Sequence, residues 1–361
     1  MITPLSGMRE NVPLAPMTTI GIGGAARWLL DAGSVEELEA GVAWAGRNGV
    51  PLFLLGGGSN VLIADEGFDG LVVRNGIGGI DTAHDGDAVR LRVGAGEAWD
   101  GVVAHAVERR WGGIEALSGI PGSTGATPIQ NVGAYGQEVA ESIVSVEALH
   151  IATGRLRTFS NGECGFEYRD SIFKREAKGE YAIVAVAFRL HPGRRGELRY
   201  PELQRYAEET YGSSPTLEQV REAVLAIRRR KGMVVDPADP DSRSDGSFFT
   251  NPIVTTDELQ AFLQRATEAE PGLRADRIPV FPAGEGRAKL SAAWLIEHAG
   301  FSKGYGDGPV GLSTKHTLAI VNRGGGTAAD VLRLVAEIQR AVATKFGVPV
   351  RPEPVFVGFG A

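Results

Sequence analysis

Apolar and polar positions near the start of the chain change from a helical period to short apolar runs. Ser34 and Glu37 have the spacing of a capping box, and apolar residues follow at helical intervals up to Gly49, which predicts a helix. Residues 52–55 and 61–63 are apolar runs typical of short buried strands. The residues between them are glycine-rich, so this region predicts a strand, a glycine turn and a second strand.

Both periods recur through the rest of the sequence, without an internal repeat. The segment 119–136 has no period but holds five glycines and two prolines, which indicates a long, shaped loop. Residues 236–245 are rich in Pro, Asp and Ser and predict a solvated loop, and a polar stretch at 193–196 indicates a boundary. Strands are predicted at 71–74, 88–93, 143–151, 182–190, 318–322 and 355–357, and helices at 97–111, 216–230, 255–268, 290–298 and 327–346.

Composition narrows the class of protein. A chain of 361 residues with 43% hydrophobic and 22% charged residues is long enough for two or three globular domains, and no apolar run is long enough to cross a bilayer. A net charge of −7 argues against a nucleic-acid partner. The single cysteine, Cys164, cannot form an internal disulfide, and the N-terminus shows no targeting pattern, so we expect a reducing, cytoplasmic setting.

Glycine is the outlier in composition. The chain has 50 glycines, about twice the usual share of roughly 7%. The pattern Gly21, Gly23, Ala26 satisfies a dinucleotide fingerprint, but a strand rather than a helix is predicted after it, which disfavours a Rossmann site. Gly56–Asn60 can present successive amides to a pyrophosphate, with a plain tight turn as the alternative. The loop 119–136 can hold another side of a nucleotide through Ser123, Thr124, Gln130 and Asn131, or it is an ordered surface loop.

Three further residues have the chemistry of an active site. Arg169 precedes an apolar pair and can grip a carboxylate, although a surface ion pair with Asp170 is the default interpretation. Ser247 lies between Gly246 and two phenylalanines, where it can donate a proton or cap a turn. Glu353 stands between two prolines as a candidate acid or as a solvated edge residue.

The remaining polar clusters give weaker signals. The six histidines have no metal-ligand spacing, so we predict no metal site. The basic run 228–231 ends a predicted helix, where it is either a solvated helix end or a phosphate clamp.

Taken together, these segments resemble the flavin-dependent UDP-N-acetylenolpyruvoylglucosamine reductases, the MurB family, nearly from end to end. Six ordered motifs carry the resemblance, at residues 19–26, 55–62, 119–126, 128–136, 168–173 and 246–252.

The resemblance implies an α+β fold with an FAD-binding part of the vanillyl-alcohol-oxidase type. Its two subdomains would be residues 1–75, joined by the C-terminal segment 347–361, and residues 76–205. A third domain at 206–346 would bind the substrate. FAD would be held without a covalent bond, and NADPH would reduce it before a UDP-sugar with an enolpyruvyl ether enters. We expect a monomer without nucleic-acid or membrane partners.

The resemblance also implies roles for single residues. Arg169, Ser247 and Glu353 would be catalytic, with Ser247 donating the proton, and Tyr200, Lys231 and Asn251 would bind substrate. The chain departs from the family at 232–245, which is longer and more acidic than usual, and beside Glu353. The alternatives are another FAD-linked oxidoreductase of this fold and a non-catalytic flavin- or sugar-nucleotide-binding protein. The cofactor-binding residues implied by the motifs are Gly56, Gly57, Gly58, Ser59, Asn60, Gly122, Ser123, Gly125, Ala126, Gln130, Asn131, Gly133 and Ala134.

Overall fold

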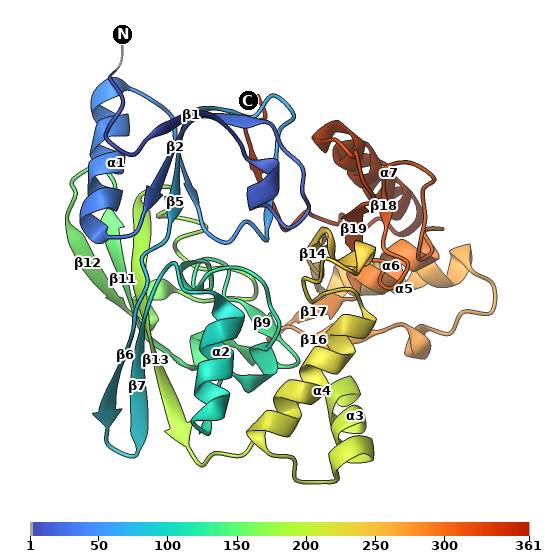
Figure 1. Cartoon of the computed structure of the whole chain (residues 1–361). Coiled ribbons are helices and arrows are strands. Elements are labelled where there is room, and N and C mark those ends of the chain that lie inside the picture. Colours follow the sequence, from blue (N-terminus) through green and yellow to red (C-terminus); the bar gives the residue numbers. More distant parts are fainter. Residues whose placement is uncertain (1–2, 361) are drawn as a thin grey trace. The chain divides into compact units, whose positions relative to one another are not determined.

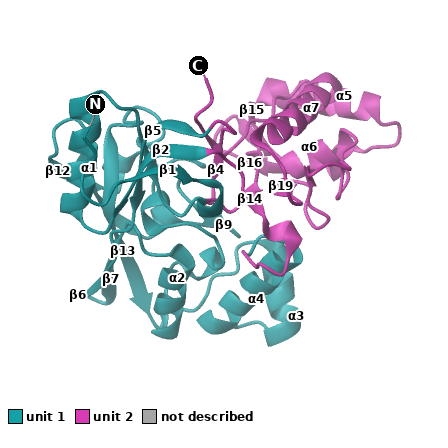
Figure 2. Ribbon diagram, turned by 45° about the horizontal axis from the view of Figure 1, so that its top comes forward, with its two compact units in different colours: residues 1–17, 25–58, 67–234 teal, residues 18–24, 59–66, 235–361 magenta. Residues whose placement is uncertain are grey.

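A computed structural model describes residues 3–360, which form two compact units (Figure 2). Unit 1 comprises the described residues up to Met17, together with residues 25–58 and 67–234, and unit 2 comprises residues 18–24, 59–66 and those from Val235 onward. Unit 1 extends to Val234, whereas the predicted substrate-binding domain begins at residue 206. The three-domain division itself stays a prediction.

The first sheet of unit 1 is mostly parallel and carries a helix on one face (Figure 1). Helix α1 (Val35–Asn48) packs Leu38 and Val42 onto this sheet, and Gly49 ends it in the left-handed conformation, which confirms the predicted helix. The capping box forms only by half, because Glu37 accepts from the amide of Gly33 rather than from that of Ser34. The strand order is β1 (Arg9–Pro13), β2 (Ala25–Ala32), β5 (Phe68–Asn75), β3 (Leu52–Leu55).

The second sheet of unit 1 is antiparallel and contains its longest strand, β13 (Tyr181–Pro192). Helix α2 (Trp99–Glu108) packs on it and is shorter than predicted, because the following residues form β8 (Trp111–Gly112) and pair with β13. The order is β12 (Leu156–Ser160), β11 (Ile143–His150), β13, β7 (Ala88–Gly94), β6 (Ile80–Asp85).

Unit 1 also holds two helices that pack side by side, α3 (Pro201–Tyr211) and α4 (Leu217–Arg230) (Figure 1). Thr216 and Gln219 form a complete capping box for the predicted α4. The sequence did not predict α3, because its mostly polar sequence buries only Leu203 and Ala207. A small ladder of β9 (Gly133–Ala134) and β10 (Gln137–Glu138) lies in the long loop.

Unit 2 has one large core shared by three short sheets and three helices. Its helices are α5 (Thr256–Ala269), α6 (Ala292–His298) and α7 (Ala328–Phe346), all three predicted. Among these helices the sequence predicted one strand, at 318–322, which the structure contains as β19; the other strands between residues 244 and 312 were missed because they are too short to show a period. The sheets are β14 (Ser244–Ser247), β19 (Ala319–Asn322), β18 (Val310–Leu312); β15 (Ile253–Thr255), β17 (Arg287–Leu290), β16 (Val280–Pro282); and the pair β20 (Val355–Val357), β4 (Val61–Ile63).

The segment 236–245 is solvated only in part: residues 236–238, Pro240 and Arg243 are exposed, as its composition predicts, but its second half is mostly buried. Asp241, Ser242 and Asp245 are buried. The carboxylate of Asp241 accepts from the amide of Thr314 at 2.9 Å and from its hydroxyl at 2.5 Å, so a contact with a distant part of the chain compensates the burial.

The mixture of helices with mainly antiparallel sheets confirms the α+β class. Within residues 3–360, none of the helices combines the length and the apolar content that a membrane crossing requires.

Candidate functional site

The turn after β3 packs directly against the long loop of unit 1. A Cβ built on Gly57 would lie 2.6 Å from Cα of Gly122 and 2.9 Å from N of Ser123, and one built on Gly56 would lie 2.6 Å from the Ser123 hydroxyl. No side chain fits there unless the backbone moves. Gly58 adds a left-handed conformation, with φ of 65°. The glycines therefore bring two main-chain segments together, which a plain tight turn does not require.

Amides at this contact have no acceptor in the protein. Among residues 3–360, the N–H groups of Gly57, Gly122 and Ser123 make no hydrogen bond, although Ser123 is buried, whereas the next two amides, of Thr124 and Gly125, bond to backbone carbonyls. Buried N–H groups without an acceptor are rare in folded proteins, which makes Ser123 unusual, whereas Gly57 is exposed and Gly122 is half-buried. Neighbouring unpaired amides form a concavity that suits an anion.

Asn131 fixes the second half of the long loop from inside. It is buried with φ of 44°, and its side-chain amide donates to Glu138 at 2.7 Å and to the carbonyl of Glu167 at 2.9 Å. Its side-chain oxygen accepts from the amide of Ala140 at 3.2 Å. These bonds occupy the side chain of Asn131, so the cofactor contact predicted for this residue would have to involve its main chain, next to the half-buried Gln130.

Arg169 lies against the same loop. Its Nη2 donates to the carbonyl of Gly133 at 2.5 Å and its Nη1 to that of Asn131 at 3.4 Å. A Cβ on Gly133 would lie 2.9 Å from Nη1 and 3.0 Å from the backbone carbonyl oxygen of Gln137, so the site is crowded at this glycine. Arg169 has φ of 55°, an uncommon conformation for a residue with a side chain. The neighbouring Asp170 forms an ion pair with Arg175 at 2.9 Å.

The two predicted substrate residues of unit 1 lie at the ends of α3 and α4. Tyr200 is the N-cap of α3, and its ring meets that of Tyr135 edge to face with centroids 5.7 Å apart. Lys231 ends α4 and forms an ion pair with Glu202 at 2.6 Å. Burial raises the pKa of Tyr200 above its ordinary value, with the nearby Glu202 charge adding to the effect.

In unit 2, backbone pairing brings Ser247 and Glu353 to adjacent segments. Ser247 ends β14, opposite Ala319, after Gly246 with φ of 72°. The amide of Glu353 donates to the carbonyl of Phe248, the residue after Ser247, at 2.8 Å. Both residues are half-buried, and the role of Glu353 stays a prediction.

The remaining predicted residues of unit 2 are also held by the backbone. The carbonyl of Asn60 accepts from the amide of Val355 at 3.0 Å, which places Ser59 and Asn60 beside the C-terminal strand. The side-chain oxygen of Asn251 accepts from the first amide of α6, that of Ala292, at 2.9 Å.

Comparisons with known proteins identify the family. Residues 27–160 match the FAD binding domain family, and residues 237–357 match the family described as UDP-N-acetylenolpyruvoylglucosamine reductase, C-terminal domain. A UDP-N-acetylenolpyruvoylglucosamine reductase of Thermobifida fusca is 51% identical over 352 residues, which cover 97% of this chain and 98% of that protein. The chain belongs to the UDP-N-acetylenolpyruvoylglucosamine reductase family. The reductase of Streptomyces coelicolor is 48% identical over 97% of this chain and 90% of its own length.

A solved member of the family has the same fold. The crystal structure of the reductase from Thermus caldophilus aligns with a TM-score of 0.63 and 27% identity, over 97% of this chain and 99% of that chain. This similarity and the FAD-domain match confirm the predicted fold and an FAD-binding part.

The described residues fit an FAD cofactor of this reductase family. The unpaired amides at Gly57, Gly122 and Ser123 suit the pyrophosphate of a dinucleotide, and the absence of side chains at Gly56 and Gly57 lets the two segments that carry these amides come together. Gly21 and Gly23 precede strand β2, as the sequence predicted, rather than opening a helix. The fit to FAD therefore depends on the glycine motifs at residues 55–62 and 119–126 and not on the motif at 19–26.

Two side chains beside the predicted substrate residues carried weak or no signals in the sequence. Arg228, the first residue of the basic run, is buried rather than solvated, and its Nε has no hydrogen-bond acceptor. Tyr135 lies within a family motif, and burial raises its pKa to about 12. Arg228 lies four residues after Val224, on the buried face of α4, so its burial could have been predicted from the helical period. The run of arginines around it favoured a solvated helix end instead.

No group of His, Cys, Asp or Glu side chains among residues 3–360 has the arrangement of a metal site. The single cysteine, Cys164, is buried, and burial raises its pKa to about 12, which leaves it protonated at neutral pH.

Proposed function

We propose that this protein is an NADPH-dependent, FAD-containing reductase that converts UDP-N-acetyl-3-O-(1-carboxyvinyl)glucosamine to UDP-N-acetylmuramate, a peptidoglycan precursor. The observation that carries the proposal is the identity of 51% over nearly the whole length of the T. fusca reductase. The contact of Gly56 and Gly57 with Gly122 and Ser123 in unit 1, here called the glycine cradle, supports it from the structure. A monomeric state and a cytoplasmic location stay predictions from the sequence.

The cradle and the loop behind it would hold the cofactor mainly through main-chain groups. Bound FAD, reduced by NADPH, supplies a hydride to the methylene carbon of the enolpyruvyl group. Tyr200, Lys231 and Asn251 would bind the UDP-sugar. The residues assigned to the cofactor are Gly56, Gly57, Gly58, Ser59, Asn60, Gly122, Ser123, Gly125, Ala126, Gln130, Asn131, Gly133 and Ala134.

Arg169, Ser247 and Glu353 would complete the reaction. As the methylene becomes a methyl group, negative charge develops on the neighbouring carbon and on its carboxylate. The Arg169 guanidinium and the Glu353 acid would stabilise this charge where it develops. Ser247 would then donate its hydroxyl proton to that carbon and recover a proton from solvent. The pairing of Glu353 with Phe248 supports the pair in unit 2, and the contact of Arg169 with Gly133 supports a place beside the cofactor loop.

An anaerobic half-reaction tests the proposal. The holoprotein is reduced with NADPH and then mixed with the enolpyruvyl sugar nucleotide, while the flavin absorbance is followed. We expect reoxidation without oxygen and formation of UDP-N-acetylmuramate. Absence of reoxidation would leave a flavin-binding protein without this activity. Flavin that stays attached after denaturation would instead indicate an alcohol oxidase with tethered flavin.

A further inference from the structure

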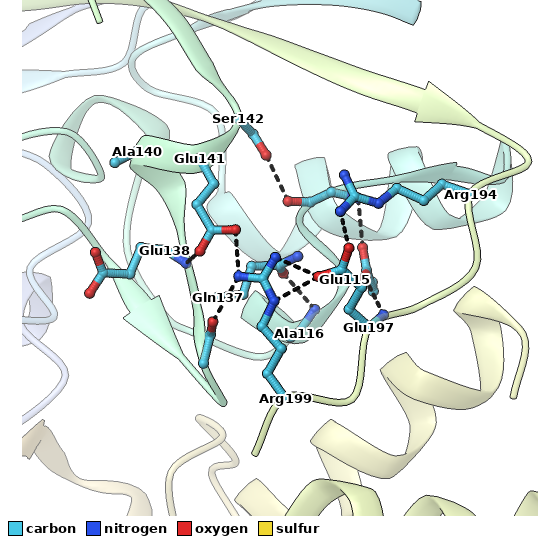
Figure 3. Close-up of polar contacts among 12 residues, drawn as sticks. Glu115, Ala116, Gln137, Glu138, Ala140, Glu141, Ser142, Arg194, Glu197 and Arg199 are labelled. Carbon is cyan, nitrogen blue, oxygen red and sulfur yellow. Dashed lines mark hydrogen bonds and ion pairs between the residues drawn. The ribbon is translucent and has the colours of Figure 1, made fainter. Parts of the chain in front are cut away.

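The segment that carries Tyr200 has no helix or strand of its own. It joins β13, which ends at Pro192, to α3, which begins at Pro201. Figure 3 shows Arg199 at the centre of the polar contacts that hold this segment. Its Nε donates to Glu197 at 2.6 Å, and its Nη1 donates to Glu141 at 2.7 Å and to the carbonyl of Gly136 at 3.2 Å.

Arg199 holds the segment of Arg199 and Tyr200 close to the segment of Tyr135 and Gly136. A Cβ on Gly136 would lie 2.8 Å from Cβ of Arg199, so Gly136 leaves room for this arginine. The residues next to them, Tyr135 and Tyr200, bring their rings together at 5.7 Å. Arg199 therefore anchors the backbone immediately before Tyr200 to the backbone immediately after Tyr135.

The anchor reaches the loop that carries the predicted cofactor residues. The second oxygen of Glu141 accepts from the amide of Glu138 at 3.3 Å, and the Glu138 carboxylate accepts from Asn131 at 2.7 Å. Arg194 also pairs with Glu197, but it makes no contact with Gly136 or Glu141. The side chains of Arg199 and Arg194 are exposed to a similar degree, 41% and 39% respectively, so Arg194 is a matched control.

We propose that Arg199 is a positioning residue that holds Tyr200 against Tyr135 in the orientation that binds the UDP-sugar. The inference rests on the proposed function, because it concerns the same substrate. Arg199 neutralises two carboxylates that face one another through it, those of Glu141 and Glu197. Without Arg199, Glu197 keeps its ion pair with Arg194, but the bonds to Glu141 and to the carbonyl of Gly136 are lost. The segment before Tyr200 then leaves the loop for part of the time. The apparent affinity for substrate is then multiplied by the fraction of molecules that keep the binding orientation, so it falls as this fraction falls.

Steady-state kinetics of Arg199→Ala test this role. We expect the KM for the enolpyruvyl sugar to rise by about tenfold and kcat to change by less than about twofold, which is the pattern of lost binding without lost chemistry. Arg199→Lys keeps the charge but loses the planar fork, so its KM should lie between that of the unmodified protein and that of Arg199→Ala. Arg194→Ala should stay within about twofold of the unmodified protein. Flavin content and the rate of reduction by NADPH should be unchanged in all three and serve as the check on folding.

A double-mutant cycle separates positioning from general stabilisation. In a Tyr200→Ala background, Arg199→Ala should raise KM no further, because its effect acts through the tyrosine. Amide hydrogen exchange should accelerate at 197–200 and 135–136 in Arg199→Ala but not in Arg194→Ala. Equal KM effects of the two alanine variants, or additive effects of Arg199→Ala and Tyr200→Ala, would overturn the inference. An unmodified protein that fails to turn over the sugar nucleotide would instead refute the proposed function.

Discussion

Asp245 is a buried carboxyl group without an adequate partner, two residues before Ser247. It is 5% exposed, one oxygen accepts from the Thr19 hydroxyl at 3.4 Å, and the other has no hydrogen-bond partner. Burial raises the pKa of Asp245 well above its ordinary value of 3.8, and the Thr19 hydrogen bond opposes this only in part. We therefore predict that Asp245→Asn stabilises the protein at neutral pH.

The sign and size of the effect follow from proton linkage. Below the unfolded pKa near 3.8, both states carry the proton on Asp245. As the pH rises above that value, the unfolded chain ionises and the folded chain does not, so the free energy of unfolding falls by up to about 1.4 kcal/mol per pH unit until the folded pKa is reached. Asp245→Asn removes this loss because an amide does not ionise in either state. Its gain should therefore be almost none at pH 4 and should grow by up to about 1.4 kcal/mol for each pH unit until the folded pKa is reached.

Urea unfolding of both proteins between pH 4 and pH 8 measures this difference, because other titrations cancel between them. Asp241→Asn is the control of opposite sign. Burial alone would raise the pKa of Asp241, but hydrogen bonds from the Thr314 side chain and amide and from Ser313, with the charge of Lys315, outweigh it and lower the pKa. That variant should be less stable than the unmodified protein at neutral pH, with the deficit disappearing as the pH falls through the folded pKa. A difference for Asp245→Asn that is constant with pH would refute a neutral Asp245.

Other predictions concern the reaction and the glycine cradle. Ser247→Ala should keep its flavin and its reduction by NADPH but lose about 10²–10⁴-fold in turnover of the enolpyruvyl sugar, and full turnover would remove Ser247 from the proton-donor role. Gly57→Ala should cost about 1–3 kcal/mol of stability and weaken retention of flavin on dialysis, because the new methyl group meets Cα of Gly122 at 2.6 Å. Gly46→Ala, in α1 with nothing within 4 Å, should be neutral or slightly stabilising, and equal flavin loss in both variants would contradict the cradle. Asp65→Ala should lower stability by about 1 kcal/mol in thermal unfolding, because its carboxylate accepts from the first two amides of α7 at 2.7 and 3.0 Å, and an unchanged midpoint would contradict this.

Local signals determined much of the secondary structure. The caps at Ser34, Thr216 and Thr327 act within one helical turn of their own residue, so the sequence displays both partners together. The strands β3, β4 and β20 were predicted at their observed bounds, because each is a short apolar run between turn residues. The family motifs likewise predicted the family and its cofactor, and the comparisons confirmed both.

Only the tertiary structure decided what those segments meet. The sequence shows that Gly57 and Gly122 are glycines, but their shared requirement for no side chain exists only because two distant loops touch. The acidic segment 236–245 was predicted to be solvated, and the structure buries Asp241 and Asp245 within it through contacts with Thr314 and Thr19, which are far away in the chain. Composition and period describe a residue and its near neighbours, whereas burial and pairing depend on contacts between segments separated by many residues.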